Sequence, residues 1–302
     1  MIDLPAPFSA QSNESHLLRA LHADIERLGL DSRSTPDAQA SVTRARQNAD
    51  AIRLIWACEC RRRFHARPFI VCGNDRLSID FIGGALGWRR AHGGNEALIA
   101  RLRGLPAGAS IIDASAGLGR DAALLIQHGY RVTACERNPW VYLLLRHAHR
   151  QWLETEPEIA SRLILHFGDV RATLKNTENL ASTAAIFDPM FPPGRSKAAV
   201  RGGLRVLQRL THVPASDATP MASIERNRFP KPDSPASLTR ERDAAETLAA
   251  LLTHCAKVVV KRPPQAPPLD PVVVGSPPHH QVPGRTVRFD VYRGVAQLDR
   301  NI

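Results

Sequence analysis

A glycine-rich turn between a short apolar strand and a helix has the residues for binding a nucleotide-like ligand. It reads Asp-Ala-Ser-Ala-Gly-Leu-Gly-Arg-Asp-Ala over residues 113–122. Gly117 and Gly119 let a ligand approach the backbone closely, and the helix that follows offers unpaired N–H groups at its N-terminus. Glu136 ends the next predicted strand, where a carboxylate can accept hydrogen bonds from both hydroxyls of an adenosine ribose. The segment therefore predicts a site for an adenosine-containing cofactor.

Two classes of cofactor are compatible with this turn. The spacing Gly117-x-Gly119-x-x-Ala122 also satisfies the dinucleotide fingerprint, which makes a nicotinamide cofactor one interpretation. Asp113 favours S-adenosylmethionine, because a carboxylate four residues before Gly117 suits the cationic side of that ligand. Asp121 disfavours a pyrophosphate at the helix N-terminus, since both groups are negatively charged. We expect S-adenosylmethionine; the alternatives are a nicotinamide cofactor and a glycine-rich turn without a ligand.

A second chemical segment, Asp-Pro-Met-Phe-Pro at 188–192, follows a predicted strand at 184–187. It is a variant of the Asp/Asn-Pro-Pro-aromatic loop of amino-methyltransferases, and in a parallel sheet it would lie at the carboxyl edge, beside the ligand. Asp188 can accept the N–H bonds of an exocyclic amine, while the prolines hold that acceptor in place. Phe191 can stack on a base turned out of its helix. An Asp-Pro pair alone is common at turns, but after the glycine turn and a fourth strand it favours methyl transfer to an amine.

Basic residues follow this loop at every fourth position. Four of them would share one face of a helix predicted over 197–210, namely Lys197, Arg201, Arg205 and Arg209. They could contact the phosphates that flank a target base, or they could simply form a solvated helix face. A Gly-Gly pair at 202–203 weakens the helix prediction.

The overall composition limits the class of protein and indicates its partner. The chain has 302 residues, 43% hydrophobic and 23% charged, which is typical of a folded globular protein. Its 40 Lys and Arg against 29 Asp and Glu give a formal charge of +11, which suits nucleic acid first and an anionic membrane surface second. No apolar run reaches the roughly 20 residues that span a bilayer, and no secretory signal is visible at the N-terminus. We expect a cytoplasmic protein without a membrane partner.

The cysteines argue against a disulfide framework and against a metal site. There are five of them, an odd number, and a reducing cytosol is consistent with that count. Cys58 and Cys60, with His65 and Cys72, could be taken as zinc ligands. The C-x-C spacing departs from C-x2-C and no second pair follows, so we expect free thiols and no metal.

The elements that would position these residues alternate along the chain. Apolar runs bounded by turn residues predict strands at 110–113, 130–136, 162–167, 184–187, 257–261 and 286–292. Helical patterns predict helices at 16–30, 120–128, 139–152, 197–210 and 240–254. Strands that alternate with helices form βαβ units on a mainly parallel sheet. Two proline-rich segments interrupt the pattern: 211–240, predicted as an insertion, and 263–283, predicted as an irregular crossing or flap.

Six ordered segments resemble a bacterial family of small-subunit ribosomal RNA guanine-N2 methyltransferases, the RsmJ family, which modifies a guanosine near the 3′ end of 16S rRNA. The segments are Ile79–Gly94, Ile112–Ala122, Cys135–Pro139, Phe187–Pro192, Val258–Leu269 and Arg288–Tyr292. The resemblance implies an α/β, Rossmann-like class I methyltransferase with a seven-stranded, mostly parallel sheet whose last strand is antiparallel. Residues 1–75 would form a small, poorly defined N-terminal region, and 76–302 the methyltransferase domain, with the insertion at 211–240.

The resemblance also implies roles for individual residues. Asp188 and Phe191 would be catalytic, with Asp188 between the methyl donor and the acceptor amine. The donor would be bound by residues after four strands: Asp113, Gly117, Gly119, Arg120, Asp121, Glu136, Arg137, Gly168, Asp169 and Asp188. Arg89 and Arg90 would help to shape the RNA-facing side. The sequence departs from the family pattern at 168–169, where Gly-Asp replaces two serines, and at Gln265, which replaces an aromatic residue.

The function implied by the resemblance is S-adenosylmethionine-dependent methylation of the exocyclic N2 of a guanosine in 16S rRNA. The partner would be free 16S rRNA or the 30S subunit, with no metal required. An amino-methyltransferase acting on DNA, transfer RNA or protein is the nearest alternative. A nicotinamide oxidoreductase and a non-catalytic RNA-binding module are alternatives of other classes.

Overall fold

The computed structural model describes residues 2–4, 15–30, 32–34, 52–60, 63–83, 87, 97–176, 184–189, 202–210 and 235–294. The chain divides into two compact units. The first comprises Met1–Gly84, Asn138–Pro157 and Ala198–Asn227, and the second comprises Ala85–Arg137, Glu158–Lys197 and Arg228–Ile302. The predicted domain boundary between residues 75 and 76 stays a prediction; β5 (Asp75–Leu77) crosses that position.

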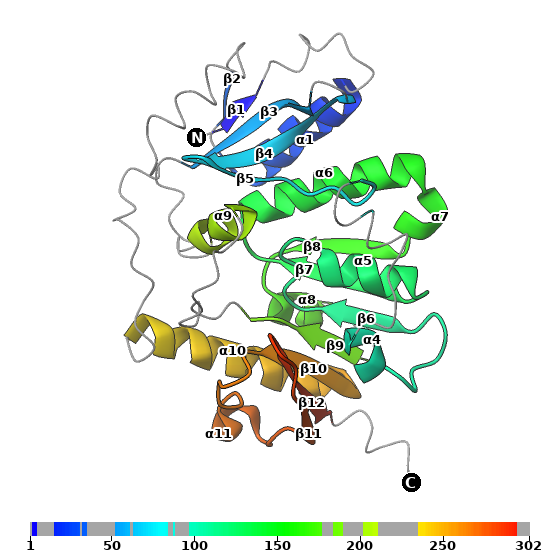
Figure 1. Ribbon diagram of the computed structural model, residues 1–302, viewed down its shortest axis with the longest axis vertical. Helices are drawn as coiled ribbons and strands as arrows, with labels where there is room; N and C mark the ends of the chain where they lie inside the picture. Colours follow the sequence, from blue (N-terminus) through cyan, green and yellow to red (C-terminus); the bar gives the residue numbers. More distant parts are fainter. Residues whose placement is uncertain are drawn as a thin grey trace. The chain divides into compact units, whose positions relative to one another are not determined.

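A seven-stranded sheet organises the second unit (Figure 1), in the strand order β11-β12-β10-β9-β6-β7-β8. Its strands are β6 (Ser110–Asp113), β7 (Arg131–Glu136), β8 (Leu163–Phe167), β9 (Ala184–Phe187), β10 (Lys257–Arg262), β11 (His280–Val282) and β12 (Arg288–Arg293). The five strands from β10 to β8 pair in parallel, and β12 and β11 are antiparallel to their neighbours. The predicted fold class and all six predicted strands are confirmed, and β11 is the seventh strand, which the sequence pattern did not predict.

Apolar side chains on two helices cover one face of this sheet. The helices are α8 (Val170–Asn176) and α10 (Pro235–His254), and their buried residues pack with Ile112 of β6, Ala185 of β9 and Val258 of β10. The central strand β9 is buried along its whole length, as expected where both faces of a parallel sheet are covered. The other helices of this unit are α4 (Ala97–Arg101), α5 (Arg120–Gln127), α7 (Pro157–Ala160) and α11 (Pro271–Val274).

The two proline-rich segments contain more regular structure than predicted. Helix α10 begins at Pro235, inside the predicted insertion 211–240, because proline is well accommodated in the first turn of a helix. The segment predicted as an irregular crossing, 263–283, contains α11 and β11. Asp270 caps α11, since its side chain accepts from the N–H of Val272 at 2.9 Å. The remainder of the insertion, 211–234, lies outside the described residues.

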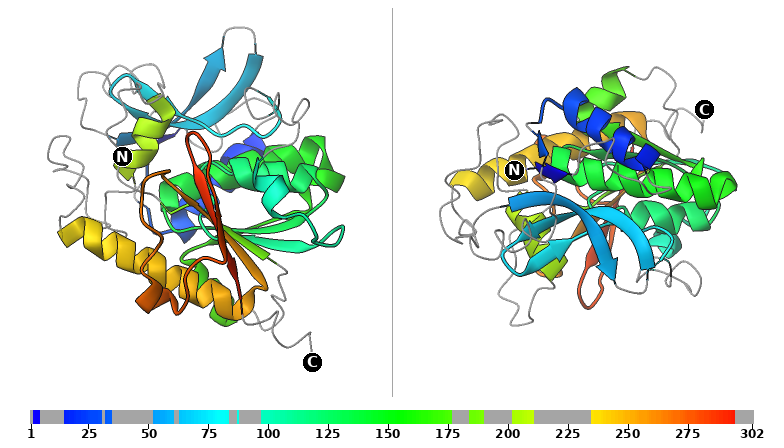
Figure 2. Two further views of the ribbon diagram at one scale, coloured as in Figure 1. Left: turned by 60° about the horizontal axis from the view of Figure 1, so that its bottom comes forward. Right: turned by 90° about the horizontal axis from the view of Figure 1, so that it is seen from above.

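The first unit holds a five-stranded sheet in the order β2-β1-β3-β4-β5. Its strands besides β5 are β1 (Ile2–Leu4), β2 (Ser32–Ser34), β3 (Ile52–Cys60) and β4 (Arg63–Cys72). The antiparallel pair of β3 and β4, drawn as two long blue strands in Figure 2, was not predicted from the sequence. The predicted helix at 16–30 is confirmed as α1 (Ser15–Arg27), which ends before Gly29, a residue with a φ of +64°.

Helix α6 (Pro139–Thr155) anchors α1 within the first unit. Asp24 of α1 is buried, and its carboxylate accepts from Arg146 Nε at 2.9 Å and from Arg150 Nη1 at 2.5 Å. Asn138 caps α6 through its Oδ1, which accepts from the N–H groups of the second and third helical residues. A buried carboxylate between two guanidinium groups needs both partners, since an unpaired buried charge is costly.

Helix α9 (Gly202–Leu210) is the described part of the helix predicted over 197–210. A Cβ atom at Gly203 would lie 3.4 Å from both the Arg76 carbonyl oxygen and Leu77 Cδ1. The Gly-Gly pair that weakened the helix prediction therefore includes a residue that allows α9 to pack closely on β5.

The cysteine and membrane predictions can be compared with the described residues. Cys72, Cys135 and Cys255 are buried free thiols, and the side chains of Cys58 and Cys60 on β3 are not described. Within the described ranges, no three His, Cys, Asp or Glu side chains are arranged to hold a metal ion. In the same residues, no helix combines the length and the apolar composition that crossing a bilayer requires.

Candidate active site

The glycine turn lies between β6 and α5 at the carboxyl edge of the seven-stranded sheet. Gly117 has a φ of +51° and Gly119 has a φ of +68°. Residues other than glycine rarely adopt this left-handed region. The N–H of Ala116 donates to the Cys135 carbonyl oxygen at 2.9 Å, which ties the turn to the neighbouring strand β7. The sequence prediction of a tight turn at the helix N-terminus is therefore matched by the backbone.

Glu136 at the end of β7 also holds this turn in place. Its Oε2 accepts a hydrogen bond of 2.8 Å from the N–H of Gly117. A carboxylate has about four acceptor sites, so this contact is compatible with the predicted contact to ribose hydroxyls. The sequence indicated the ligand contact only, and the contact to the turn is an additional finding.

Asp113 presents a buried carboxylate to the same region. Its Oδ1 accepts from the N–H of Ser115 at 3.2 Å, whereas its Oδ2 is buried and has no hydrogen-bond partner among the described residues. Burial, and then the charges of Asp121 and Asp188, raise the pKa of Asp113 to about 8, although the Ser115 N–H and the Lys261 ammonium oppose that rise. A buried oxygen without a partner fits a cationic ligand, and S-adenosylmethionine carries positive charge on its sulfonium and amino groups.

Asp188 follows β9 directly and lies against the glycine turn. Its N–H donates to Ser115 Oγ at 2.9 Å, so residues 113–122 and the start of the 188–192 segment are in contact. The Asp188 side chain is 52% exposed, yet loss of hydration among the surrounding protein atoms and the charge of Asp121 raise its pKa to about 6, against the opposing effect of Lys261. The group therefore has an accessible surface and a carboxylate that titrates close to neutral pH.

Lys261 joins this cluster from β10, although the sequence analysis did not select it. Its ammonium forms an ion pair with Asp121 and lies 3.6 Å from Asp188 Oδ2. Lys261 stands at the end of an apolar strand and within the segment Val258–Leu269 that carries the family resemblance, and that position was the available signal. Asp121 and Asp188, which were predicted on separate elements, both pair with the Lys261 ammonium.

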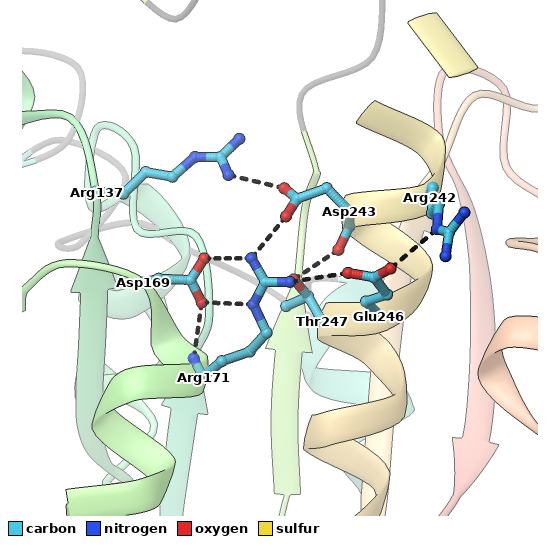
Figure 3. Close-up of polar contacts among 7 residues, drawn as sticks. All are labelled: Arg137, Asp169, Arg171, Arg242, Asp243, Glu246 and Thr247. Carbon is cyan, nitrogen blue, oxygen red and sulfur yellow. Dashed lines mark hydrogen bonds and ion pairs between the residues drawn. The ribbon is translucent and has the colours of Figure 1, made fainter. Parts of the chain in front are cut away.

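Asp169 and Arg137 are connected through a second cluster of charges (Figure 3). Arg171 donates from its backbone N–H and Nε to Asp169 Oδ1 at 2.8 and 2.9 Å, and from Nη2 to Asp169 Oδ2 at 2.7 Å. The same Nη2 donates to Asp243 Oδ1 at 2.6 Å, and Arg137 Nη1 donates to Asp243 Oδ2 at 2.8 Å. Burial alone would raise the pKa of Asp169, but the hydrogen bonds and charge of Arg171 lower it overall.

This network attaches α10 to the segments that follow β7 and β8. Glu246 of α10 accepts from Arg171 Nη1 at 3.4 Å and from Arg242 Nε at 3.1 Å. Thr247 Oγ1 donates to the Asp243 carbonyl oxygen at 2.8 Å (Figure 3). Arg171 and Asp243 were not predicted, because only the folded sheet brings α10 beside the segment at 168–171.

The other predicted donor residues lie at the same strand ends. Gly168 has a φ of +124°, and its N–H donates to the Glu136 carbonyl oxygen at 3.0 Å. Arg120 is exposed at the first position of α5, and Asp121 follows it with a side chain that is one quarter exposed. All the predicted donor positions are thus described in one unit, after the ends of β6, β7, β8 and β9.

Several predicted residues cannot be placed in this site. Phe191, Arg89, Arg90, Lys197 and Arg201 lie outside the described residues, and the side chain of Arg209 is not described. Arg205, in the first unit, donates from Nε to Asp75 Oδ2 at 2.7 Å and forms a second contact to the same carboxylate. Its predicted contact with phosphate stays a prediction, and would have to compete with this ion pair.

Comparison with protein families identifies the class of enzyme. The family model described as "Putative SAM-dependent methyltransferase" matches residues 68–223, slightly more than half of the chain. A crystal structure of a SAM-dependent methyltransferase from Neisseria gonorrhoeae covers 98% of this chain and 96% of its own, with a TM-score of 0.59 and 22% identity. That similarity supports the fold. The predicted donor, S-adenosylmethionine in place of a nicotinamide cofactor, is confirmed by the family.

Curated relatives define the family more narrowly. A protein named ribosomal RNA small subunit methyltransferase J from Alkalilimnicola ehrlichii is 38% identical over 66% of this chain and 66% of its own length. Proteins of the same name from Rhodopseudomonas palustris and Agrobacterium fabrum are 35% and 33% identical, and in each the match spans 93% of the relative. The chain therefore belongs to the ribosomal RNA small subunit methyltransferase J family, as its motifs predicted.

Proposed function

We propose that this enzyme transfers a methyl group from S-adenosylmethionine to the exocyclic N2 of a guanosine in 16S rRNA of the small ribosomal subunit. The observation that carries the proposal is the contact between Asp188 and the glycine turn, where the Asp188 N–H donates to Ser115 Oγ at 2.9 Å. This contact puts a hydrogen-bond acceptor for an amine beside the expected donor site. The names of the relatives supply the substrate class, since those proteins are small-subunit ribosomal RNA methyltransferases.

The donor half of the site would be formed by residues at the ends of β6, β7 and β8. Glu136 would accept from the ribose hydroxyls, and Asp169 would border the adenine with its one remaining acceptor position. Asp113, whose Oδ2 has no hydrogen-bond partner among the described residues, would face the cationic part of the donor. When bound, S-adenosylmethionine supplies an electrophilic methyl carbon on a positively charged sulfur. Gly117, Gly119, Arg120, Asp121, Arg137 and Gly168 would line the rest of the donor site.

The acceptor half would centre on Asp188. Its carboxylate would accept the N–H bonds of the guanine amine and help to localise the nitrogen lone pair. As N2 gained the methyl group, sulfur would keep the electron pair of the broken carbon–sulfur bond, and Asp188 would accept the one proton that N2 releases. The role of the residues themselves is mainly to align the amine with the methyl carbon. Phe191 would provide the surface on which the extruded base stacks.

Contacts with RNA would extend beyond the target base. The formal charge of +11 supports a polyanionic partner. Phosphate contacts are proposed for the basic residues predicted from the sequence, namely Arg89, Arg90, Lys197, Arg201, Arg205 and Arg209. A ribosomal RNA substrate would also place the enzyme in the cytoplasm, where small subunits assemble.

The proposal is tested by identifying the nucleoside that receives the methyl group. Purified protein and labelled S-adenosylmethionine would be incubated with 30S subunits and with free 16S rRNA, both from cells that lack this protein, and the RNA digested to nucleosides. Label in N2-methylguanosine is the expected result. Label in another nucleoside, or label found only when DNA, transfer RNA or protein is offered instead, would contradict the assignment of substrate.

A further inference from the structure

Three carboxylates and one ammonium group converge at the carboxyl edge of the seven-stranded sheet. The carboxylates belong to Asp113 at the end of β6, Asp121 in the first turn of α5 and Asp188 after β9. Lys261, near the end of β10, forms ion pairs with two of them, and its side chain is only 18% exposed. The proposed donor and acceptor roles involve the carboxylates and leave the lysine without an assignment.

Strand register explains why Lys261 meets Asp188. Strands β9 and β10 are parallel neighbours, and Phe187 pairs with Val260. The next residues along these strands are Asp188 and Lys261, so they lie side by side, about 4.8 Å apart in strand spacing. Because the chain between β9 and β10 is long, this proximity follows from the fold and not from sequence spacing.

We propose that Lys261 is a positioning residue for methyl transfer, whose ammonium keeps the Asp188 carboxylate ionised and oriented toward the acceptor amine. The inference rests on the proposed function of Asp188. A carboxylate can accept both N–H bonds of an amine only while it is ionised, because a protonated carboxyl has become a donor at one oxygen. Lys261 supplies the positive charge that favours the ionised form.

The charges around Asp188 act in opposite directions on its ionisation. Asp121 from α5 carries the same sign of charge as Asp188 and raises its pKa, and Asp113 from β6 faces the same cluster. On the other side of β10, Arg288 and Asp290 of β12 pair with each other at 2.7 and 2.9 Å. Lys261 supplies a positive charge in contact with Asp188, since its ammonium lies 3.6 Å from Asp188 Oδ2.

The same geometry accounts for the direction of the pKa shift of each group. Loss of hydration among the surrounding protein atoms and the charge of Asp121 raise the pKa of Asp188 to about 6, and Lys261 acts in the opposite direction. Burial alone would lower the pKa of Lys261, but Asp121, Asp188 and Asp113 raise it above its usual value overall. The ammonium thus stays charged throughout the range in which Asp188 titrates.

Two substitutions and one control separate positioning from a merely structural role. Lys261→Met removes the charge and preserves most of the length, whereas Lys261→Arg preserves the charge. Lys257→Met is a matched control at the opposite end of the same strand, where the lysine ammonium donates to the carbonyl oxygens of Arg101 and Arg103 at 3.2 and 3.4 Å. All three proteins would first be checked for native circular dichroism.

The pKa of Asp188 would be measured by carbon-13 NMR of the carboxyl group in the full-length protein without donor. A neighbouring opposite charge lowers a carboxyl pKa by about 1–3 units, so Lys261→Met should raise the value by about that amount. The acid limb of the pH profile of kcat/KM should move by the same amount. A shift of about two units would lower the rate at pH 7 by about tenfold and restore it near pH 9. Lys261→Arg and Lys257→Met should leave both values close to wild type.

An unchanged Asp188 pKa in folded Lys261→Met would overturn the inference, whatever happens to activity. If Lys261→Met does not fold, the ammonium of Lys261 can be titrated in Asp188→Asn instead, where its pKa should fall below the wild-type value; an unchanged value would overturn the inference equally. A wild-type protein that methylates neither 30S subunits nor 16S rRNA would contradict the proposed function, and the NMR titration distinguishes that failure from the failure of this inference.

Discussion

The donor half and the acceptor half of the candidate site are held by different kinds of contact. In the donor half, backbone N–H groups bind carboxylates: Gly117 donates to Glu136, Ser115 to Asp113, and Arg171 to Asp169. Around Asp188 in the acceptor half, side-chain charges face each other, because Lys261 pairs with Asp188 and also with Asp121 of the donor half. Backbone N–H groups therefore contribute throughout the donor half, with the Arg171 side chain added at Asp169, whereas a balance of side-chain charges surrounds Asp188.

Because of this difference, we expect the two halves to respond differently to substitution. A change in the backbone of the turn should alter how tightly the donor binds, because the fixed N–H groups and the turn shape form its site. A change at Asp188 should mainly alter how fast the methyl group is transferred, because its carboxylate holds the amine. Substitutions in each half can therefore test whether donor binding and methyl transfer depend on different residues.

The largest effect is expected for Asp188→Asn. The amide keeps the size of the side chain but cannot accept the N–H bonds and the proton as a carboxylate does. Loss of a preorganised polar group should reduce the single-turnover rate by at least about 100-fold. Rapid-quench measurement with 30S subunits checks the rate, and a residual rate within tenfold of wild type would exclude a central role for Asp188.

Asp113→Asn should change the pH dependence of stability. The pKa of Asp113 is about 8 in the folded protein and near 3.8 in the unfolded chain, so the folded state holds an extra proton between these values. Stability contributed by this group is complete below about pH 4 and is lost as pH rises through about 8, by up to about 1.4 kcal/mol per pH unit. Asp113→Asn has no carboxyl group at this position and should not lose this stability as the pH rises.

Urea unfolding of both proteins at pH 5, 6.5 and 8 measures the effect. The stability of Asp113→Asn relative to wild type should increase steadily from pH 5 to pH 8. Parallel pH dependence of the two proteins would show that the pKa of Asp113 is not raised in the folded state, which would contradict this prediction.

The secondary structure around the site could largely be predicted from sequence, because its signals are local. Ser110–Asp113 and Ala184–Phe187 are apolar runs that end at a polar turn residue, and both strands have the predicted bounds. The glycines at 117 and 119 have the positive φ that their type suggested. In each case the strand or turn is determined by the conformational preferences and the apolar pattern of a few neighbouring residues.

The partners within the site could not be predicted, because they depend on which strands and helices become neighbours. Lys261 meets Asp188 through the register of β9 with β10, and Arg171 meets Asp243 through the packing of α10. The long strands β3 and β4 were also missed, because arginines and cysteines interrupt the apolar alternation that indicates a strand. These contacts can be recognised only when the fold is known, because the spacing of the residues along the sequence does not indicate them.

Gly117→Ala should weaken donor binding by about tenfold. A residue with a side chain at a φ of +51° is strained by about 1–2 kcal/mol, and the turn should relax away from the shape that holds the donor. Gly129→Ala is the control, because Gly129 has a φ of +86° beyond the end of α5 and nothing lies within 4 Å of an added Cβ. Isothermal titration with S-adenosylmethionine should show weaker binding for the first variant only; equal weakening in both would assign the effect to general strain.

The smallest effect is expected for Arg171→Ala. The substitution removes the side-chain donors that hold Asp169, and the loss of about 1 kcal/mol of hydrogen bonding should weaken donor binding by about fivefold. Arg242→Ala removes a mostly exposed cation that contacts Glu246, the outer member of the cluster, and this variant should bind the donor like wild type. Donor affinities that are identical in all three proteins would remove Asp169 from the donor site.

One paired measurement tests the separation of the two halves most directly. The donor dissociation constant and the single-turnover rate at saturating donor would be determined for wild type, Gly117→Ala and Asp188→Asn in parallel. A crossed pattern is predicted: Gly117→Ala binds the donor about tenfold more weakly but transfers at nearly the wild-type rate, and Asp188→Asn binds it within about threefold of wild type but transfers at least about 100-fold more slowly. If each variant instead lost affinity and rate to the same degree, the donor and acceptor halves would act as one unit, which would contradict their separation.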